Sequence, residues 1–301
     1  MSSLLTNNAA MTALLSLQQT QQNLATYEQQ VSTGLKISSA SDNPSYWSIA
    51  TSMNSQVGAL GAVSSALSES ASILSTMSAA LTQTVSIVDN IKNDLLTAEQ
   101  PSTDLSKIQT DIAVQQQTLI SIGTSSSFNG LNLLASATGS TVSLVSSYSA
   151  ASGTSFISLS TTDTALFGTG VSNGSTANLS GGGGILDQNG ANYTSASILS
   201  LDVSSATAGD LANMLADVES ALTNIETAAS TIGATQTNIT EQQTFISNLS
   251  DSLTSGVGSL VDANMNEASS KISALQVQQE LGVQALSIAN SNTQLILKLF
   301  Q

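Results

Sequence analysis

Leu211-Ala-Asn-Met-Leu-Ala-Asp-Val218 begins a region, extending to Phe300, in which apolar side chains recur every three or four positions. The steps alternate between four and three, and this spacing is typical of a helix that packs along a seam on another helix. The first series consists of Leu211, Leu215, Val218, Leu222, Ile225, Ala229, Ile232, Gln236, Ile239, Gln243, Ile246, Ser250, Leu253, Val257 and Leu260. The pattern therefore predicts a long helix here with a partner helix beside it.

Beyond Leu260 the C-terminal region carries apolar residues on more than one helical face. One series continues the seam with Val261, Met265, Ala268, Ile272, Leu275, Leu286, Ala289, Ile296 and Phe300. A separate row contains Leu281, Ala285, Ile288, Leu295 and Leu299. A helix that is apolar on several sides needs more cover than one partner helix gives. We therefore expect this helix to be incomplete in a single copy of the chain.

The N-terminal region, from Ser2 to Leu35, repeats the same spacing. Its apolar face carries Ala10, Ala13, Leu17, Leu24, Tyr27 and Val31. Because both chain ends are long, amphipathic and sparsely charged, they are predicted to pack against each other. An ordinary pair of helices within one chain would also explain this seam. The apolar row at Leu281, Leu295 and Leu299 favours additional partners.

Three further helices are expected to form a rod between the two chain ends. Gly34, the following serines and Pro44 end the N-terminal helix. A heptad pattern then runs from Met53 to Leu95, which predicts a helix from Trp47 to Glu99 that ends before Pro101. Ser102 or Thr103 is expected to cap the next helix, which ends between Ser125 and Phe128. Its seam contains Leu105, Ile108, Ile112, Leu119 and Ile122, and the helix beginning near Leu211 completes the rod.

Residues 135–206 differ in composition from the rest, being rich in Ser, Thr, Gly and Asn. Alternating β-branched residues at 141–145 and 155–159, flanked by turn residues, predict strands. Gly181–Gly184 lacks the lysine and spacing of a phosphate-binding loop, so a plain loop is expected.

The predicted domains are 1–43 (coiled-coil helix and connector), 44–134 (rod helices), 135–206 (β-rich insertion), 207–257 (rod helix) and 258–301 (coiled-coil helix).

Composition excludes several classes of function. The 301 residues include 20 carboxylates against five lysines and no arginine, so the net charge is −15 and neither nucleic acid nor an anionic membrane is an expected partner. Histidine and cysteine are absent, which removes the commonest general base and the thiolate metal ligands. Asp163, Asp187 and Asp202 lack the spacing of a calcium loop. Asp217 and Glu219 are expected to be solvated, and no catalytic, metal or cofactor site is predicted.

The first residues lack the charged and apolar regions of a cleaved signal peptide, and no uninterrupted apolar run approaches the length of a membrane span. This pattern fits a cytoplasmic protein, and it equally fits one exported without a cleaved signal. The absence of cysteine suits the second route, because a chain exported unfolded gains nothing from disulfides.

Three motifs in order resemble bacterial flagellins. They are Leu24-Ala-Thr-Tyr-Glu-Gln-Gln-Val-Ser-Thr-Gly-Leu-Lys-Ile-Ser-Ser-Ala-Ser-Asp-Asn43, Ser127-Phe-Asn-Gly-Leu-Asn-Leu-Leu134, and Ala285-Leu-Ser-Ile-Ala-Asn290 followed by Leu295-Ile-Leu-Lys-Leu-Phe300. Tyr46-Trp47-Ser-Ile-Ala-Thr-Ser-Met53 is similar to the alphaproteobacterial members in particular. The resemblance covers both terminal regions and leaves out the insertion, which varies freely in that family.

The resemblance implies a mainly α-helical fold, with a coiled-coil rod formed by both chain ends and a β-rich outer insertion. It implies a structural, non-enzymatic subunit that polymerises into the extracellular flagellar filament for swimming. Export would proceed unfolded through the flagellar type III apparatus, without a cleaved signal peptide. The implied partners are further copies of the chain, an export chaperone, and the hook–filament junction and cap proteins.

The residues implied to pack in the filament core are Leu17, Leu24, Tyr27, Val31, Leu281, Leu286, Leu295, Leu299 and Phe300. Two alternatives stay open: a hook–filament junction protein, and a surface protein that binds polysaccharide through the insertion. Aromatic residues for stacking on sugars are few in the insertion, namely Tyr148, Phe156, Phe167 and Tyr193. Ser86–Ile91 and Gln29-Gln30 stand where many flagellins carry arginine, so recognition by the vertebrate innate receptor is not expected. Asn192-Tyr-Thr194 matches a glycosylation acceptor pattern that chance explains better.

Overall fold

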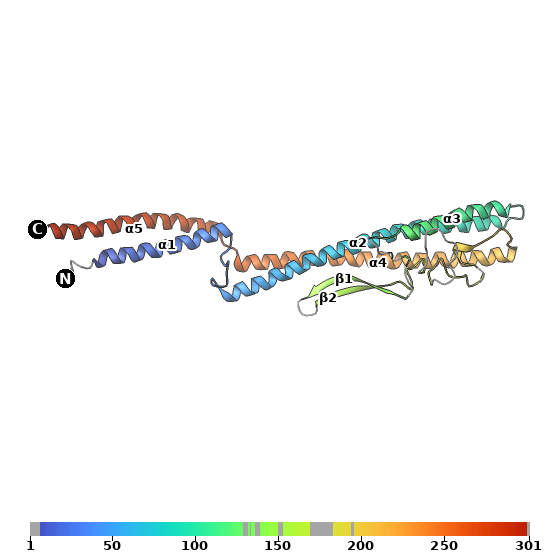
Figure 1. The fold of residues 1–301 in the computed structure, drawn as a ribbon, viewed down its shortest axis with the longest axis horizontal. Coiled ribbons are helices and arrows are strands. Elements are labelled where there is room, and N and C mark those ends of the chain that lie inside the picture. Colours follow the sequence, from blue (N-terminus) through green and yellow to red (C-terminus); the bar gives the residue numbers. More distant parts are fainter. Residues whose placement is uncertain are drawn as a thin grey trace. The chain divides into compact units, whose positions relative to one another are not determined.

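The computed structural model describes residues 7–128, 132, 134–135, 139–149, 153–168, 183–193 and 196–299, with side chains described as far as residue 291. The elements are α1 (Asn8–Thr33), α2 (Pro44–Ala98), α3 (Leu105–Ser125), β1 (Thr141–Ser149), β2 (Gly153–Ser160), the 3-10 helix η1 (Ile198–Ser200), α4 (Ala208–Val261) and α5 (Met265–Leu299) (Figure 1). The mainly helical fold with a small central sheet is as predicted. Two compact units are present: an end unit (residues 1–58 and 250–301) and a middle unit (residues 59–249).

Three helices supply the core of the middle unit, and their buried residues follow the predicted heptads. α2 buries Leu60, Leu67, Leu74, Leu81, Val88 and Leu95; α3 buries Ile108, Ile112 and Leu119; α4 buries Leu211, Val218, Ile225, Ile232, Ile239 and Ile246. Polar contacts connect the helices at the edges of this core. Lys92 Nζ on α2 lies 3.0 Å from Glu219 Oε1 on α4, and Gln115 Nε2 on α3 donates to Asp94 Oδ2 on α2 at 2.8 Å.

The ends of the rod helices differ in detail from the sequence prediction. α3 is capped by Asp104, whose carboxylate accepts the Ser106 N–H at 3.1 Å, so the expectation of a Ser102 or Thr103 cap is wrong. An aspartate placed directly before the first helical residue satisfies free N–H groups as well as serine does. α2 begins at Pro44 rather than at Trp47. Proline is favoured at the first helical position because its missing N–H would have no partner there.

By length and composition, α2 is apolar enough to cross a membrane. Its long apolar residues, Leu60, Leu67, Leu74 and Leu81 among them, are buried inside the protein. The core of the middle unit therefore accounts for the hydropathy of this helix.

β1 and β2 form an antiparallel hairpin that confirms both predicted strands. The pairing shifts between Val145 and Ser147, so one residue of β1 is bulged. Leu144 and Leu159 on one face of the hairpin are buried. Phe167, in the following loop, is fully buried, and its ring lies so close to Gly123 at the end of α3 that a Cβ there would overlap it. A side chain larger than hydrogen at Gly123 would therefore displace this loop.

Candidate assembly interface

α1 is held at both ends by hydrogen bonds that its sequence provides. At the start, Asn7 Oδ1 accepts the Ala10 N–H at 3.1 Å, while Asn7 Nδ2 donates to the Ala289 carbonyl of α5 at 3.0 Å. At the end, Gly34 adopts a left-handed conformation (φ 73°), and its N–H donates to the Gln30 carbonyl. Glycine suits this position because a Cβ would be strained at positive φ.

α1 and α5 pack side by side in antiparallel orientation within the end unit (Figure 1). Three contacts fix the register: Asn7 lies at Ala289, Leu17 at Gly282, and Gly34 at Ala263. A Cβ at Gly282 would lie 3.3 Å from Leu17 Cδ1, tighter than ordinary packing. Glycine at 282 thus lets α1 approach closely in the middle of the seam.

The segments that follow α1 and precede α5 are joined by backbone hydrogen bonds. The Lys36 N–H donates to the Val261 carbonyl at 2.7 Å, and the Ala263 N–H donates to the Gly34 carbonyl at 2.9 Å. Val261 also belongs to a small apolar cluster with Ile37, Ala50 and Val257. Leu35, Met53 and Leu260 pack against this cluster. The break between α4 and α5 therefore lies at residues 262–264, bonded to the connector that follows α1.

Asp42 shapes the loop between α1 and α2. Its Oδ2 accepts the Ser39 and Ser38 N–H groups, at 2.9 and 3.0 Å, and both serine hydroxyls. These backbone hydrogen bonds, the Ser39 N–H first, lower the pKa of Asp42 below 3.8. The loop is thus held by a charged carboxylate at neutral pH.

The predicted packing residues occupy two different environments. Leu17, Leu24, Tyr27 and Val31 on α1 are half-buried, and so is Leu286 on α5. Leu281, in contrast, is 57% exposed. Leu295 and Leu299 belong to α5, but their side chains lie outside the description, as does the whole of Phe300. The filament role of these nine residues stays a prediction.

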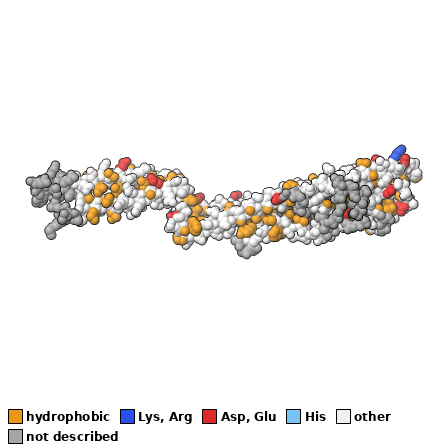
Figure 2. Space-filling view, in the orientation of Figure 1, with side chains coloured by type: hydrophobic (Ala, Val, Ile, Leu, Met, Phe, Trp, Pro, Cys, Tyr) orange, Lys and Arg blue, Asp and Glu red, His pale blue; other side chains and the backbone are white. Residues whose placement is uncertain are grey.

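Two groups of exposed apolar side chains lie outside the α1–α5 seam. We call Val277, Leu281 and Ile288 the α5 stripe; these residues share one helical face, and each is more than half exposed. We call Met11, Leu14 and Leu15 the α1 stripe; Leu15 is 68% exposed. Figure 2 shows hydrophobic side chains at the surface along this pair of helices.

The α1 stripe and Val277 were missed by the heptad reading of the sequence. The available signal was a second apolar spacing, Met11-Leu14-Leu15, displaced from the seam positions Ala10, Ala13 and Leu17. A search for one seam per helix does not detect a second face.

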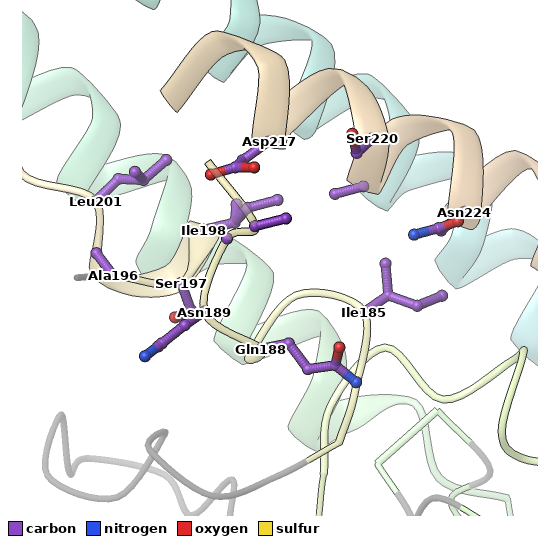
Figure 3. Close-up of a pocket in the computed structure, with 13 residues that line it drawn as sticks. Ile185, Gln188, Asn189, Ala196, Ser197, Ile198, Leu201, Asp217, Ser220 and Asn224 are labelled. Atoms are coloured by element: carbon purple, nitrogen blue, oxygen red, sulfur yellow. The ribbon is translucent and has the colours of Figure 1, made fainter. Parts of the chain in front are cut away.

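A separate hollow of about 170 Å³ lies in the middle unit between α4 and the loop that precedes it (Figure 3). Asp217 of α4 points into it, and its carboxylate accepts the Tyr193 N–H, the Asn192 N–H and the Asn192 side-chain amide. Burial works to raise the pKa of Asp217, but these hydrogen bonds outweigh it and leave the pKa below 3.8. The expectation that Asp217 is solvated is therefore wrong, because the loop covers it.

The same loop is attached to α3 by two glutamines that sequence reasoning did not single out. Gln116 Nε2 donates to the Ile198 carbonyl at 2.9 Å, and Gln109 Oε1 accepts the Val203 N–H at 2.7 Å. The hollow is thus lined by groups that already bind one another, which indicates a structural role. Asn192 is the asparagine of the glycosylation acceptor pattern. Its Nδ2 donates to Asp217 Oδ1 at 2.8 Å, so this side chain is also bound within the protein.

Asp187 is the most enclosed carboxylate described. Burial raises its pKa above 3.8, although N–H groups of Gly168, Gly184 and Asp187 itself act in the opposite direction. Its Oδ2 accepts the Gly168 N–H at 2.6 Å, while Oδ1 is buried without a hydrogen-bond partner. In the described parts of the chain, no three His, Cys, Asp or Glu residues come together as metal ligands.

Comparison with known proteins assigns the family. The model of the bacterial flagellin N-terminal helical region matches residues 4–138, and that of the C-terminal helical region matches residues 215–300. A flagellin of Brucella melitensis biotype 1 is 42% identical, flagellin C of Rhizobium meliloti is 36% identical, and each alignment covers both chains fully. Flagellin FljK of Caulobacter vibrioides is 29% identical over the whole of this chain and 99% of the relative. The chain therefore belongs to the bacterial flagellin family and is a structural subunit of the flagellar filament.

Proposed function

We propose that the α1–α5 pair holds this filament together by covering its exposed stripes with neighbouring copies. The observation that carries the proposal is the α5 stripe of Val277, Leu281 and Ile288, left open to solvent although α1 packs beside the same helix. Contiguous apolar surface of this kind marks an interaction site.

The energy available is sufficient for assembly. Full burial of a Leu, Ile or Val side chain is worth about 1.5–3 kcal/mol, so covering the six half-exposed residues of both stripes contributes on the order of 5 kcal/mol. Part of this gain offsets the ordering of the chain ends. Each copy in a polymer repeats the contact with its neighbours, which multiplies the effect.

The arrangement of the stripes suits an open polymer. The α1 stripe and the α5 stripe belong to different helices of one pair, so a neighbour can meet each of them through a different surface. Such a heterologous contact, when it does not close into a ring, produces a helical filament.

The finer points of the flagellin resemblance belong to the same proposal. Residues 1–43 and 258–301 form the inner core of the filament, 44–134 and 207–257 the rod, and 135–206 the outer domain. The subunit is exported unfolded through the type III apparatus without a cleaved signal, with a chaperone on its apolar C-terminal helix. It then adds beneath a cap on the far side of the junction proteins. The absence of histidine and cysteine supports a purely structural, non-enzymatic role.

Electron microscopy of clipped chains on filament seeds tests this proposal. A chain lacking residues 1–33, or one lacking residues 265–301, should stay soluble and helical and should add to no seed. Full-length protein should grow long tubes. Ordinary tubes from either clipped chain would contradict the proposal. Short assemblies from the full-length chain would instead favour a junction protein.

A further inference from the structure

Asp187 extends a short backbone pairing within the insertion. The N–H groups of residues 185 and 186 donate to the carbonyls of residues 165 and 166, at 3.0 and 2.8 Å. The Gly168 N–H, which follows on the second of these segments, donates to Asp187 Oδ2 at 2.6 Å. We call this pairing of residues 165–168 with residues 184–187 the insertion ladder. The Asp187 side chain binds one end of it.

Phe167 attaches the insertion ladder to the end of α3. Its N–H donates to the Leu134 carbonyl at 2.9 Å, and its ring lies so close to Gly123 that a Cβ there would overlap it. A Cβ at Gly184, on the other segment of the ladder, would overlap the Phe167 backbone. Two glycines thus allow tight packing on both sides of Phe167. Separation of the two segments would therefore loosen the attachment to α3.

The carboxylate of Asp187 is enclosed without full compensation. Its side chain belongs to a residue that is only 3% exposed, and Oδ1 is buried with no hydrogen-bond partner among the described residues. Leu166, Phe167 and Leu186 of the same ladder are fully buried apolar residues. A buried ionised carboxylate is costly unless both of its oxygens are paired. The charged form of Asp187 therefore weakens the closed ladder.

No neighbouring charge in the sequence offsets this cost. Residues 164–201 contain no lysine and no carboxylate besides Asp187; Tyr193 is their one other titratable group, and Asp163 before them is exposed. From Ile112 to its end, α3 also carries no charged residue. Burial and backbone N–H groups determine the pKa of Asp187, and no charged side chain of α2, α3 or α4 adds to these causes.

We propose that Asp187 is a proton-operated latch, which closes the insertion ladder more tightly as a carboxylic acid than as a carboxylate. Protonation removes the buried charge, while the carboxyl group keeps an oxygen that accepts the Gly168 N–H. The latch lies in the middle unit, and it acts independently of the α1 and α5 stripes.

Closure of the ladder takes up a proton over part of the pH range. Burial raises the pKa of Asp187 above 3.8 in the closed ladder, whereas opening returns the carboxyl group to water and to its ordinary pKa. The stabilisation is therefore complete below pH 3.8 and is lost as the pH rises through the raised pKa. Asp217, whose pKa is lowered, responds in the opposite direction.

Hydrogen exchange of the full-length subunit, followed by mass spectrometry between pH 4 and 7, tests the latch. Exchange rates are corrected for the intrinsic pH dependence of amides. In the wild type, protection of residues 184–187 should rise as the pH falls, by at most about tenfold per pH unit because one proton is involved. Asp187→Asn cannot take up this proton, so its protection should not change with pH.

Two control variants separate the latch from other carboxylates. Asp163→Asn removes an exposed charge from the same insertion, and Asp94→Asn removes a carboxylate of α2 whose pKa burial also raises. Both should keep the response of residues 184–187. A response that persists in D187N, or that disappears in D163N or D94N, would overturn the proposal. Protection that is constant or falls in acid in the wild type would overturn it whether or not D187N folds.

Discussion

At the scale of single residues, Asp217 holds a loop that has little regular structure of its own. Its two carboxylate oxygens accept hydrogen bonds from Asn192 and Tyr193, and burial of the group is offset by those bonds. Gly190 makes the approach possible, because a Cβ there would overlap the carboxylate. The Asp217 carboxylate and the lack of a side chain at Gly190 together allow the loop to lie against α4.

Asp217→Asn should destabilise the middle unit by about 1–3 kcal/mol at neutral pH. The amide would place its own N–H group against the N–H groups of the loop, and those groups would lose an acceptor. The pKa of Asp217 is lowered on folding, so its contribution is complete above pH 3.8 and is lost as the pH falls through the lowered value. Urea unfolding at a series of pH values should show the two proteins converging in acid. A constant difference down to the lowest pH would contradict the assignment.

Side chains such as Asp217 and Gln116 explain why part of the site could not be predicted. Their partners are backbone groups of residues 192–201, and sequence spacing contains no signal for a loop that folds back onto a helix. The spacing of Asp217 and Glu219 correctly placed them on different sides of a helix. It did not show that one of those sides is covered.

At the scale of elements, the α1–α5 pair combines a covered seam with uncovered stripes. Leu17 faces Gly282 in the seam, whereas Leu15, two residues earlier, is largely exposed. The seam therefore stabilises the single copy, and the stripes are the surface that we propose is covered in assembly.

Leu17→Ala should destabilise the α1–α5 pair in the monomer by about 1–2 kcal/mol, less than for a fully buried leucine because Leu17 is half-buried. Hydrogen exchange of the monomer should then be faster in both helices. Leu15→Ala is the matched control and should leave monomer exchange unchanged. Equal effects of the two variants would show that the seam described here does not form in the free subunit.

Element prediction succeeded where one periodicity covers many turns. The heptads in α2, α3 and α4 fixed the buried residues Leu67, Ile112 and Ile232, because a long seam leaves few alternatives. The hairpin strands were also visible in their alternation. The bulge that turns Tyr148 toward Phe156 was not, because a register shift of one residue leaves no mark in the alternation.

At the scale of the whole molecule, charge repulsion opposes the association that we propose for the apolar stripes. The chain carries 20 carboxylates and five lysines, and two ion pairs, Lys92–Glu219 and Lys107–Asp104, occur among the described residues. The carboxylates thus outnumber the lysines fourfold, and the resulting repulsion between copies depends on ionic strength.

Seeded polymerisation should accelerate as salt is added. The Debye length falls from about 30 Å at 0.01 M to about 10 Å at 0.1 M, which screens repulsion between copies of charge −15. Light scattering across that range should show a rising elongation rate. A rate that declines steadily with salt would mean that attraction between charges, rather than apolar contact, drives growth.

Seeded growth of a full-length variant in which Val277, Leu281 and Ile288 are all serine measures most directly whether the α5 stripe drives assembly. Phe245→Ser is the control, since Phe245 is equally exposed on α4 outside the stripe. We expect the triple variant to keep the helical content and monomer stability of the wild type and to add to no seed, while the control grows normally. Tubes growing from the triple variant at the wild-type rate would contradict the proposed role of the stripe.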